Sequence, residues 1–282
     1  MKIITGGGYG HLPLFLGYVG AGLCDGIAVG NVFTSPSSEA IMNVAKDLDS
    51  TELLFLFGNY FGDTMNFEMA GEMLEMDGIA SNILKGADDI ASSEDPQARR
   101  GIAGILFAYK IAGAAADRGW GLEKVTEITS RAISQIASLG VAFSSCRLPG
   151  ADKPIFELEE DEMEIGMGIH GEPGIHRGHL MTSKELAKRL VEDCLEDLKI
   201  REKDRIAVLV NGLGSTSREE LFVLFNDMEQ IFSERKVQIA KTYVGEYVTS
   251  MEMAGLSLSI LRLDEELEEL LNVPAHSPFV TL

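Results

Sequence analysis

Short apolar runs, each followed by a polar loop and then by a helical pattern, recur along the first half of the chain. Lys2 to Thr5 is a strand-like run that ends at a glycine loop, and Leu53 to Phe57 is a run of five apolar residues that ends at Gly58 and Asn59. A continuous apolar run bounded by polar residues suits a strand that is buried on both faces. Because such strands alternate with helices, the pattern predicts a parallel sheet with helices on its faces.

The pattern changes near Gly140, where long helical segments give way to short strand-like pieces. The other helices are expected over residues 14–23, 38–48, 65–76, 102–116, 122–137, 182–198 (with Ser183 as the N-cap), 218–235 and 264–271. The other strands are expected over residues 80–84, 141–145, 155–158, 163–168, 205–210, 237–243 and 256–262. We therefore expect an α/β protein with a parallel-sheet, three-layer N-terminal domain at residues 1–140 and a second α/β, two-layer domain at residues 141–282.

Composition narrows the possible functions. The 44 acidic and 24 basic residues give a formal net charge of −20, which argues against nucleic-acid binding and fits either a well-solvated acidic protein or one that docks a basic partner. No apolar run reaches the roughly 18 residues of a membrane span, and the first residues do not resemble a signal peptide. The three cysteines, Cys24, Cys146 and Cys194, lack metal-ligand spacing and are predicted to be small buried side chains in a reducing, cytoplasmic compartment.

The first candidate site is the glycine loop Gly6-Gly7-Gly8-Tyr9-Gly10-His11, which follows a predicted strand. Glycines at such a place let the backbone approach a ligand closely. The spacing fits neither the Walker pattern nor the dinucleotide fingerprint. A tight turn in which His11 only packs or caps a helix is an equally good interpretation.

The second candidate is Asp63, which follows the strand of residues 53–57 in a polar loop. Ligands of open parallel sheets lie at the carboxyl ends of the strands, and an aspartate placed there can accept a proton from a substrate hydroxyl. From the residues alone, a helix N-cap is the more common role of such an aspartate.

The third candidate is His170, within the segment Gly166-Met167-Gly168-Ile169-His170-Gly171-Glu172-Pro173-Gly174. Five of these nine residues are glycine or proline, so the backbone is highly specified and presents a histidine and a glutamate from a rigid turn. A neutral imidazole is a competent nucleophile toward a carbonyl carbon.

Other features favour structural roles. His176 and His179 lie close to His170, but no cysteine or acidic cluster accompanies them at ligand spacing, so we expect no metal site. Asn211 to Thr216 is expected to be a strand-to-helix connection with an N-cap rather than an anion site. The methionines at helical spacing, Met65, Met69, Met73 and Met76, are predicted to fill the core.

Taken together, these motifs resemble the K subunit of dihydroxyacetone kinases. The matching segments are residues 6–11, 33–36, 59–68, 166–175 and 209–214, which occur in the family's order from end to end. Each motif is weak alone, and the ordered set is highly specific.

The resemblance implies a dimeric subunit in which His170 forms a covalent hemiaminal with the carbonyl of dihydroxyacetone or a similar short ketose. It implies that His11 and Asp63 contact the substrate hydroxyls and assist proton transfer, and that Gly8 and Ser35 line the pocket. Phosphate would then pass to a hydroxyl of the bound triose.

The resemblance also implies that this chain carries no cofactor of its own. Magnesium with ADP or ATP would be held by a separate L subunit, which an M subunit rephosphorylates in the phosphotransferase-system version. The chain would then be a phosphotransferase subunit with an alcohol group as acceptor, and it would need that partner for activity.

The chain departs from the family pattern at three places. Gly58 stands where the family usually has a lysine that helps to hold the ketose, and Tyr9 replaces a small serine. The family's N-terminal extension does not precede residue 1, so the sequence is either a natural short form or begins inside a longer protein. Without the lysine, a larger ketose such as a tetrulose could fit. A rival interpretation is a non-catalytic, ketone-sensing transcriptional co-regulator, which would need His170 but not Asp63.

Overall fold

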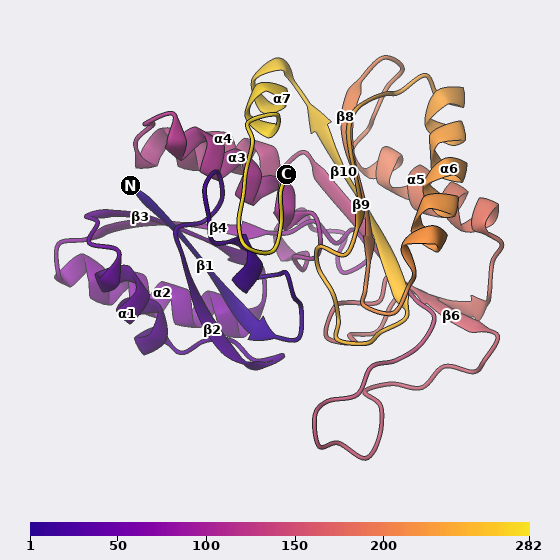
Figure 1. Ribbon diagram of the computed structural model, residues 1–282, viewed down its shortest axis with the longest axis horizontal. Helices are drawn as coiled ribbons and strands as arrows, with labels where there is room; N and C mark the ends of the chain where they lie inside the picture. The colour runs from indigo at the N-terminus through magenta and orange to yellow at the C-terminus, as the bar shows by residue number, and fades with distance from the viewer. The chain divides into compact units, whose positions relative to one another are not determined.

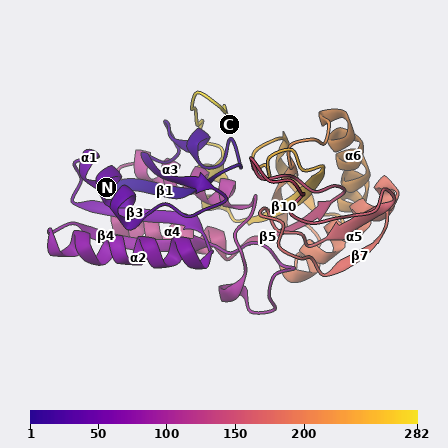
Figure 2. The same ribbon diagram turned by 90° about the horizontal axis from the view of Figure 1, so that it is seen from below.

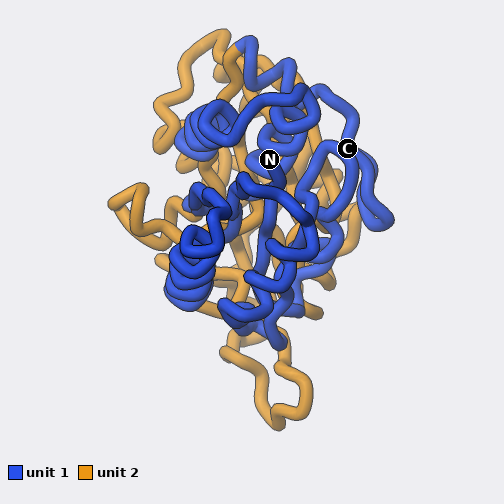
Figure 3. Tube along the Cα trace, turned by 90° about the vertical axis from the view of Figure 1, so that its left-hand side faces the viewer, with its two compact units in different colours: residues 1–87, 105–134, 265–282 blue, residues 88–104, 135–264 orange.

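The computed structural model describes all 282 residues, which form two compact units that interleave along the chain (Figure 3). Unit 1 consists of residues 1–87, 105–134 and 265–282, and unit 2 consists of residues 88–104 and 135–264. The chain therefore does not change from one domain to the other once, near Gly140, as expected, but passes between the two units four times. The reason is that residues 105–134 return to cover the first sheet, and that residues 265–282 return to pack on the helix of residues 105–117 and on residues 17–22.

Unit 1 has a four-stranded parallel sheet in the order β2-β1-β3-β4. Its strands are β1 (Lys2–Tyr9), β2 (Gly26–Val32), β3 (Glu52–Gly58) and β4 (Ala80–Gly86). Its helices are α1 (Ser38–Asp47), α2 (Phe61–Met76), α3 (Ile105–Asp117), α4 (Leu122–Ile133) and α7 (Glu265–Leu271). Helices α1 and α2 pack on one face of the sheet and α3 and α4 on the other, which gives the expected three layers (Figure 1).

The core of unit 1 follows from the apolar strand that the sequence marks. Every residue of Leu53 to Phe57 is fully buried, and alternate side chains point to opposite faces of the sheet. Phe55 and Phe57 pack against Phe67 of α2, whose ring lies 4.2 Å from that of Phe57. Burial on both faces is what a central strand of a parallel sheet requires.

Unit 2 has a six-stranded sheet in the order β7-β6-β5-β10-β8-β9, in which only β8 and β9 are parallel. Its strands are β5 (Ile136–Ala142), β6 (Glu162–Ile165), β7 (His176–His179), β8 (Arg205–Gly212), β9 (Gln238–Gly245) and β10 (Gly255–Leu263). Helices α5 (Ser183–Asp197) and α6 (Arg218–Glu234) pack together on one face of this sheet, so the unit has two layers (Figures 1 and 2).

Several local predictions are wrong. The helix expected over residues 14–23 is only a short 3-10 turn, Leu16–Tyr18. After this turn Gly20 and Gly22 lie against the backbone of residues 276 and 274, and Gly22 has a φ of +71°, which a regular helix does not accommodate. Residues 155–158 form no strand, and β2 and β7 were missed. The N-cap of α5 is Thr182 rather than Ser183, and it forms a reciprocal capping box with Glu185.

The junction between α4 and β5 is also shifted. We expected a helix to residue 137 and a strand over residues 141–145, whereas α4 ends at Ile133 and β5 already begins at Ile136. Residues 136–142 pair with β10 along its length, from Ile136 opposite Leu261 to Ala142 opposite Gly255. This long-range pairing overrides the local helical pattern.

The methionines of α2 do not fill the core as predicted. Met65, Met69, Met73 and Met76 are 40–80% exposed, and Phe61 at the start of the helix is 84% exposed. The buried face is made by Phe67, Ala70 and Leu74 instead, together with Asp63 and Gly71. Exposed apolar patches of this kind are typical of interaction surfaces.

The cysteines behave as predicted, since Cys24, Cys146 and Cys194 are all free and buried. Burial raises the pKa of each thiol, most strongly for Cys24 and Cys194. None of the helices is both long enough and apolar enough to span a membrane.

Candidate functional site

The carboxyl edge of the sheet in unit 1 carries four of the predicted site residues. Gly8 and His11 lie at the end of β1, Ser35 follows β2, and Asp63 follows β3. Because β1, β2 and β3 are parallel neighbours, their carboxyl ends meet at one edge, which is where ligands bind in sheets of this type.

His11 is completely buried and lies among aromatic rings. Its imidazole stacks on Phe33 with ring centroids 4.8 Å apart and 13° between the planes, and Phe15 meets it edge-on at 6.3 Å. Gly6, Gly7 and Gly8 belong to β1 itself rather than to a turn, and Gly10, which follows the strand, has a positive φ of 109°. Packing against Phe33 and Phe15 therefore helps to hold the His11 ring, in line with one of the two interpretations that the sequence allows.

The loop after β2 lies between the glycine segment and the start of α2. A Cβ atom on Gly8 would lie 2.6 Å from the backbone nitrogen of Thr34, and one on Gly62 would lie 2.7 Å from Oγ of Ser35. Ser35 therefore lies directly beside the residue that precedes Asp63. Sequence reasoning missed Phe33, which adopts a strained φ of +53° to stack on His11.

Asp63 is the third residue of α2 and is 7% exposed. The N-cap of this helix is Tyr60, so the interpretation of Asp63 as an N-cap is wrong. Asp63 therefore lies in the first turn of α2, where the positive end of the helix dipole attracts negative charge.

His170 lies in the loop between β6 and β7 of unit 2, and the backbone of this loop is tightly specified. Gly166 and Gly171 have φ values of +84° and +82°, which favour glycine. The N–H of Gly171 donates to the carbonyl of Gly168 at 3.1 Å, and the hydroxyl of Ser250 donates to the carbonyl of Ile169 at 2.7 Å. The loop therefore presents His170 from a fixed frame, as its glycine content predicts.

Glu172 holds the imidazole of His170 at one nitrogen. Its Oε1 lies 3.0 Å from Nδ1 of His170, and its Oε2 accepts the backbone N–H of His170 at 2.9 Å. Burial alone would raise the pKa of Glu172, but the hydrogen bond and the charge of His170 outweigh it and lower the pKa to about 2. An ionised carboxylate can only accept, so Nδ1 carries a proton, and whenever the ring is neutral its free lone pair is on Nε2.

The structure thus assembles two sets of groups. In unit 1 it brings Gly8, His11, Ser35 and Asp63 to one sheet edge, and in unit 2 it pairs His170 with Glu172. The first set contains a histidine and an aspartate, residue types that can exchange protons, and the second contains an imidazole held by a carboxylate.

The remaining sequence candidates have structural partners. No group of three or more histidine, cysteine, aspartate or glutamate side chains is placed to hold a metal ion, and His179 instead pairs with Asp161 at 2.9 Å. The side chain of Asn211 is buried and bonds the backbone of residues 247 and 248. The N-cap after it is Ser217, as expected for a strand-to-helix connection.

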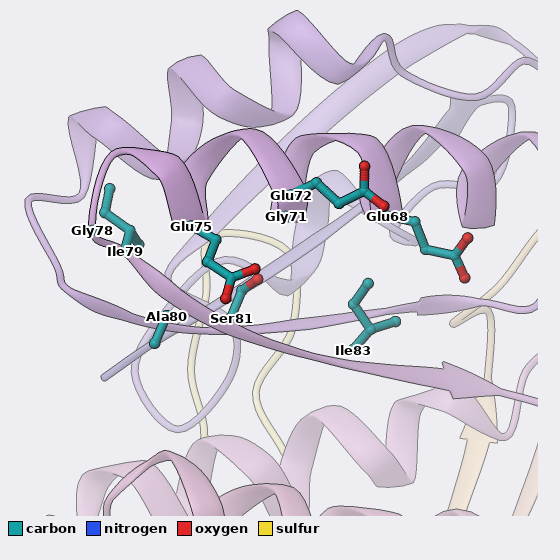
Figure 4. A pocket seen from close by; sticks show the side chains of 9 residues that line it. All are labelled: Glu68, Gly71, Glu72, Glu75, Gly78, Ile79, Ala80, Ser81 and Ile83. Atoms are coloured by element: carbon teal, nitrogen blue, oxygen red, sulfur yellow. The ribbon is translucent and has the colours of Figure 1, made fainter.

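A groove of about 570 Å³ lies elsewhere in unit 1, between α2 and the edge strand β4 (Figure 4). It is lined by Glu68, Glu72 and Glu75 of α2 and by residues near the amino end of β4. The carboxylates would repel a phosphorylated ligand, and the groove is at the wrong end of the strands for a site of this sheet type.

The family model of the Dak1 domain matches residues 1–279, a range that includes all the motif segments. The chain belongs to this family. A curated relative, the dihydroxyacetone-binding subunit DhaK of the phosphotransferase-system-dependent dihydroxyacetone kinase 2 of Listeria innocua, is 42% identical over 99% of this chain and 85% of its own length.

Two further matches bear on the alternatives. D-erythrulose kinase of Mycolicibacterium smegmatis is 45% identical over 99% of this chain, which spans only 48% of that enzyme. The solved structure of the dihydroxyacetone kinase operon co-activator DhaQ superimposes with a TM-score of 0.92 and is 30% identical, over 98% of this chain and 86% of its own. The resemblance to dihydroxyacetone kinase K subunits and the α/β fold are therefore confirmed.

Proposed function

We propose that this chain is the substrate-binding subunit of a dihydroxyacetone kinase, which holds a short ketose on His170 and presents its hydroxyl for phosphorylation. The observation that carries the proposal is the pairing of Nδ1 of His170 with the ionised Glu172 at 3.0 Å. This pairing selects the tautomer whose Nε2 can attack a carbonyl carbon. Membership of the Dak1 family supports the choice of a ketone as the electrophile.

In the proposed binding step, the lone pair of Nε2 forms a bond to the carbonyl carbon while the carbonyl π bond breaks. The carbonyl oxygen takes a proton from solvent and becomes the hydroxyl of a hemiaminal. The imidazole becomes cationic as the new bond forms, and the carboxylate of Glu172 stabilises that charge through Nδ1–H. Glycerol has no carbonyl carbon to attack, so this step selects ketones and aldehydes.

In the proposed transfer step, Asp63 accepts the proton of the substrate hydroxyl while the hydroxyl oxygen bonds to the phosphorus of the donor and the bond from that phosphorus to the donor's own oxygen breaks. The position of Asp63 in the first turn of α2, at the carboxyl edge of the sheet, supports this role. His11 would bind a second hydroxyl, with its ring fixed by Phe33. Gly8 and Ser35 would line the pocket at the same sheet edge.

The phosphoryl donor is proposed to come from a partner. The relative in Listeria is named as a dihydroxyacetone-binding subunit of a phosphotransferase-system-dependent kinase, which supports a separate nucleotide-bearing L subunit and an M subunit. Magnesium and ADP or ATP would then be held by the L subunit. The exposed apolar face of α2 supports a protein partner, and we propose that the chain is also a homodimer.

The ketose itself has two candidates. Gly58 stands where family members usually carry lysine, and the 45% identity to an erythrulose kinase favours a tetrulose as the alternative to dihydroxyacetone. Comparing kcat/KM for dihydroxyacetone and erythrulose would decide between them.

A second candidate function is a ketone-sensing co-regulator, which the likeness to the DhaQ co-activator favours. The test is to combine the purified chain with cognate L subunits and phosphoryl donors and to measure ketose phosphate. Formation of the product supports the kinase. Absence of product with several L subunits, while the ketone still binds to His170, supports the sensor.

A further inference from the structure

Arg100 reaches the His170 loop from a segment that lies about 70 residues earlier in the chain. Its Nη2 donates to the carbonyl of Gly166 at 3.1 Å, at the start of the loop. Its Nη1 lies 3.9 Å from Oε2 of Glu172, an ion-pair distance that is too long for a hydrogen bond. One guanidinium therefore contacts both the backbone of the loop and the carboxylate that orients His170.

Arg100 is itself fixed by Asp89. The Nε of Arg100 donates to Oδ2 of Asp89 at 2.9 Å, and Nη2 lies 2.7 Å from the same oxygen. The side chain of Asp89 is only 1% exposed, and its backbone N–H donates to the carbonyl of Arg100 at 3.0 Å. Burial raises the pKa of Asp89 to about 6, and the charge of Arg100 opposes that rise. The pair is thus joined through side chains and backbone at once.

Gly168 shows that the guanidinium and the carboxylate share a confined space. A Cβ atom on Gly168 would collide with Oε2 of Glu172 and would lie 2.8 Å from Nη1 of Arg100. The absence of a side chain at Gly168 therefore makes room for both groups. This explains a glycine that no positive φ requires.

We propose that Arg100, held by Asp89, is a positioning residue that fixes Glu172 and the loop, and thereby sets the tautomer and direction of His170. It completes a chain of contacts from His170 through Glu172 and Arg100 to Asp89, all within unit 2. This inference rests on the proposed function of His170 as the ketone anchor. Partners of this outer kind commonly decide which nitrogen of a functional histidine is protonated.

The geometry requires arginine rather than a positive charge alone. Three nitrogens of one planar group are used: Nε and Nη2 toward Asp89, Nη2 also toward Gly166, and Nη1 toward Glu172. A lysine ammonium is a point charge and cannot meet three partners in these directions. Arg100→Lys should therefore preserve the fold of the chain but not the tautomer and direction of the His170 ring.

Arg99 provides a matched control. It is the neighbouring residue, its side chain is 9% exposed, and it forms its own partly buried ion pair with Asp197 at 2.6 Å. It also donates to the carbonyl of Ser93, so Arg99→Gln removes a comparable set of bonds from the same segment. None of these contacts involves the His170 loop.

The experiment uses the whole chain labelled with ¹⁵N-histidine, in the variants Arg100→Gln, Arg100→Lys and Arg99→Gln. Long-range ¹H–¹⁵N spectra report which ring nitrogen of His170 carries the proton, and intact mass spectrometry reports binding of dihydroxyacetone. We expect both Arg100 variants to lose the single Nδ1–H tautomer and to bind the ketone about tenfold more weakly, within the range seen for partners of functional histidines. Arg99→Gln should keep both properties.

The two readouts separate the possible failures. If the Arg100 variants keep the wild-type tautomer and ketone affinity, or if Arg99→Gln loses them equally, the positioning role is overturned. If the wild-type chain shows the Nδ1–H tautomer but binds no ketone, the proposed function fails, and the tautomer of the Arg100 variants still tests the inference. Arg100→Lys keeps the test available should Arg100→Gln fail to fold.

Discussion

The two sets of candidate residues are held by different means. In unit 1, Asp63 is placed by a strand end and the first turn of a helix, and His11 by the end of the neighbouring strand. In unit 2, His170 lies in an irregular loop that is fixed by Glu172, Ser250 and the partly buried Arg100. Regular structure is enough to position the proposed proton acceptor at a sheet edge, whereas the proposed nucleophile is held by a dedicated set of side chains.

The largest expected effect separates phosphoryl transfer, which is proposed to need Asp63 of unit 1, from ketone binding, which is proposed to need His170 of unit 2. Asp63→Asn removes the proposed proton acceptor without touching the His170 loop, so phosphoryl transfer with an L subunit should fall by about 10²–10⁴-fold. Binding of the ketone to His170 should remain. Asp77→Asn, at the exposed C-terminal end of the same helix, is the control and should leave the rate unchanged. Equal losses in the two variants would contradict the role of Asp63.

The second-largest expected effect concerns the carboxylate of Glu172, which holds His170, the proposed nucleophile. Glu172→Gln removes the carboxylate that holds Nδ1–H, so ketone affinity measured by intact mass should fall by about 10–100-fold. The control is Asp161→Asn, which disrupts the similar pair of Asp161 and His179 on the surface, where both side chains are more than two-thirds exposed. If Glu172→Gln binds the ketone as well as wild type does, orientation by this carboxylate is not needed.

Much of unit 1 can be predicted from the sequence, because its signals are local. The apolar run of residues 53–57 marks a buried central strand, and the polar loop after it locates Asp63 at the sheet edge. The strand β2 and the exposed methionines of α2 were missed, because burial there depends on neighbouring elements rather than on periodicity.

Less of unit 2 can be predicted in this way. The glycines and proline around His170 indicate a rigid loop, but nothing local links that loop to Arg100 and Asp89, which lie far back in the chain. Likewise, β5 begins earlier than the local pattern suggests because it pairs with β10, more than 110 residues later. The chain shows such partners only once it is folded.

A smaller effect should appear in the pH dependence of stability. The pKa of Glu172 is about 2 in the folded chain, below its ordinary value of 4.5, so the folded state binds fewer protons than the unfolded state between these values. The stabilisation is complete above about pH 4.5 and is lost as the pH falls toward 2, with a size on the order of 1–3 kcal/mol. The free energy of unfolding, measured with urea, should fall less steeply between pH 4.5 and pH 2 in Glu172→Gln than in the wild type. Equal falls in the two proteins would mean that His170 does not hold the Glu172 carboxylate as described.

The smallest expected effect concerns Gly58, at the carboxyl end of β3. Introducing the family's usual lysine with Gly58→Lys should shift the preference from erythrulose toward dihydroxyacetone by about tenfold in the ratio of kcat/KM values. Gly58→Met, of similar length without charge, is the control that separates bulk from charge. An unchanged ratio in the lysine variant would remove Gly58 from the account of specificity.

The central claim is that His170 bonds to the ketone. Intact mass spectrometry of the chain incubated with dihydroxyacetone tests it directly, with His170→Ala beside the wild type. The account predicts that the wild type gains the mass of the whole ketone without loss of water, as a hemiaminal requires, and that His170→Ala gains nothing. Formation of the same adduct by His170→Ala, or a mass gain that includes loss of water, would contradict it.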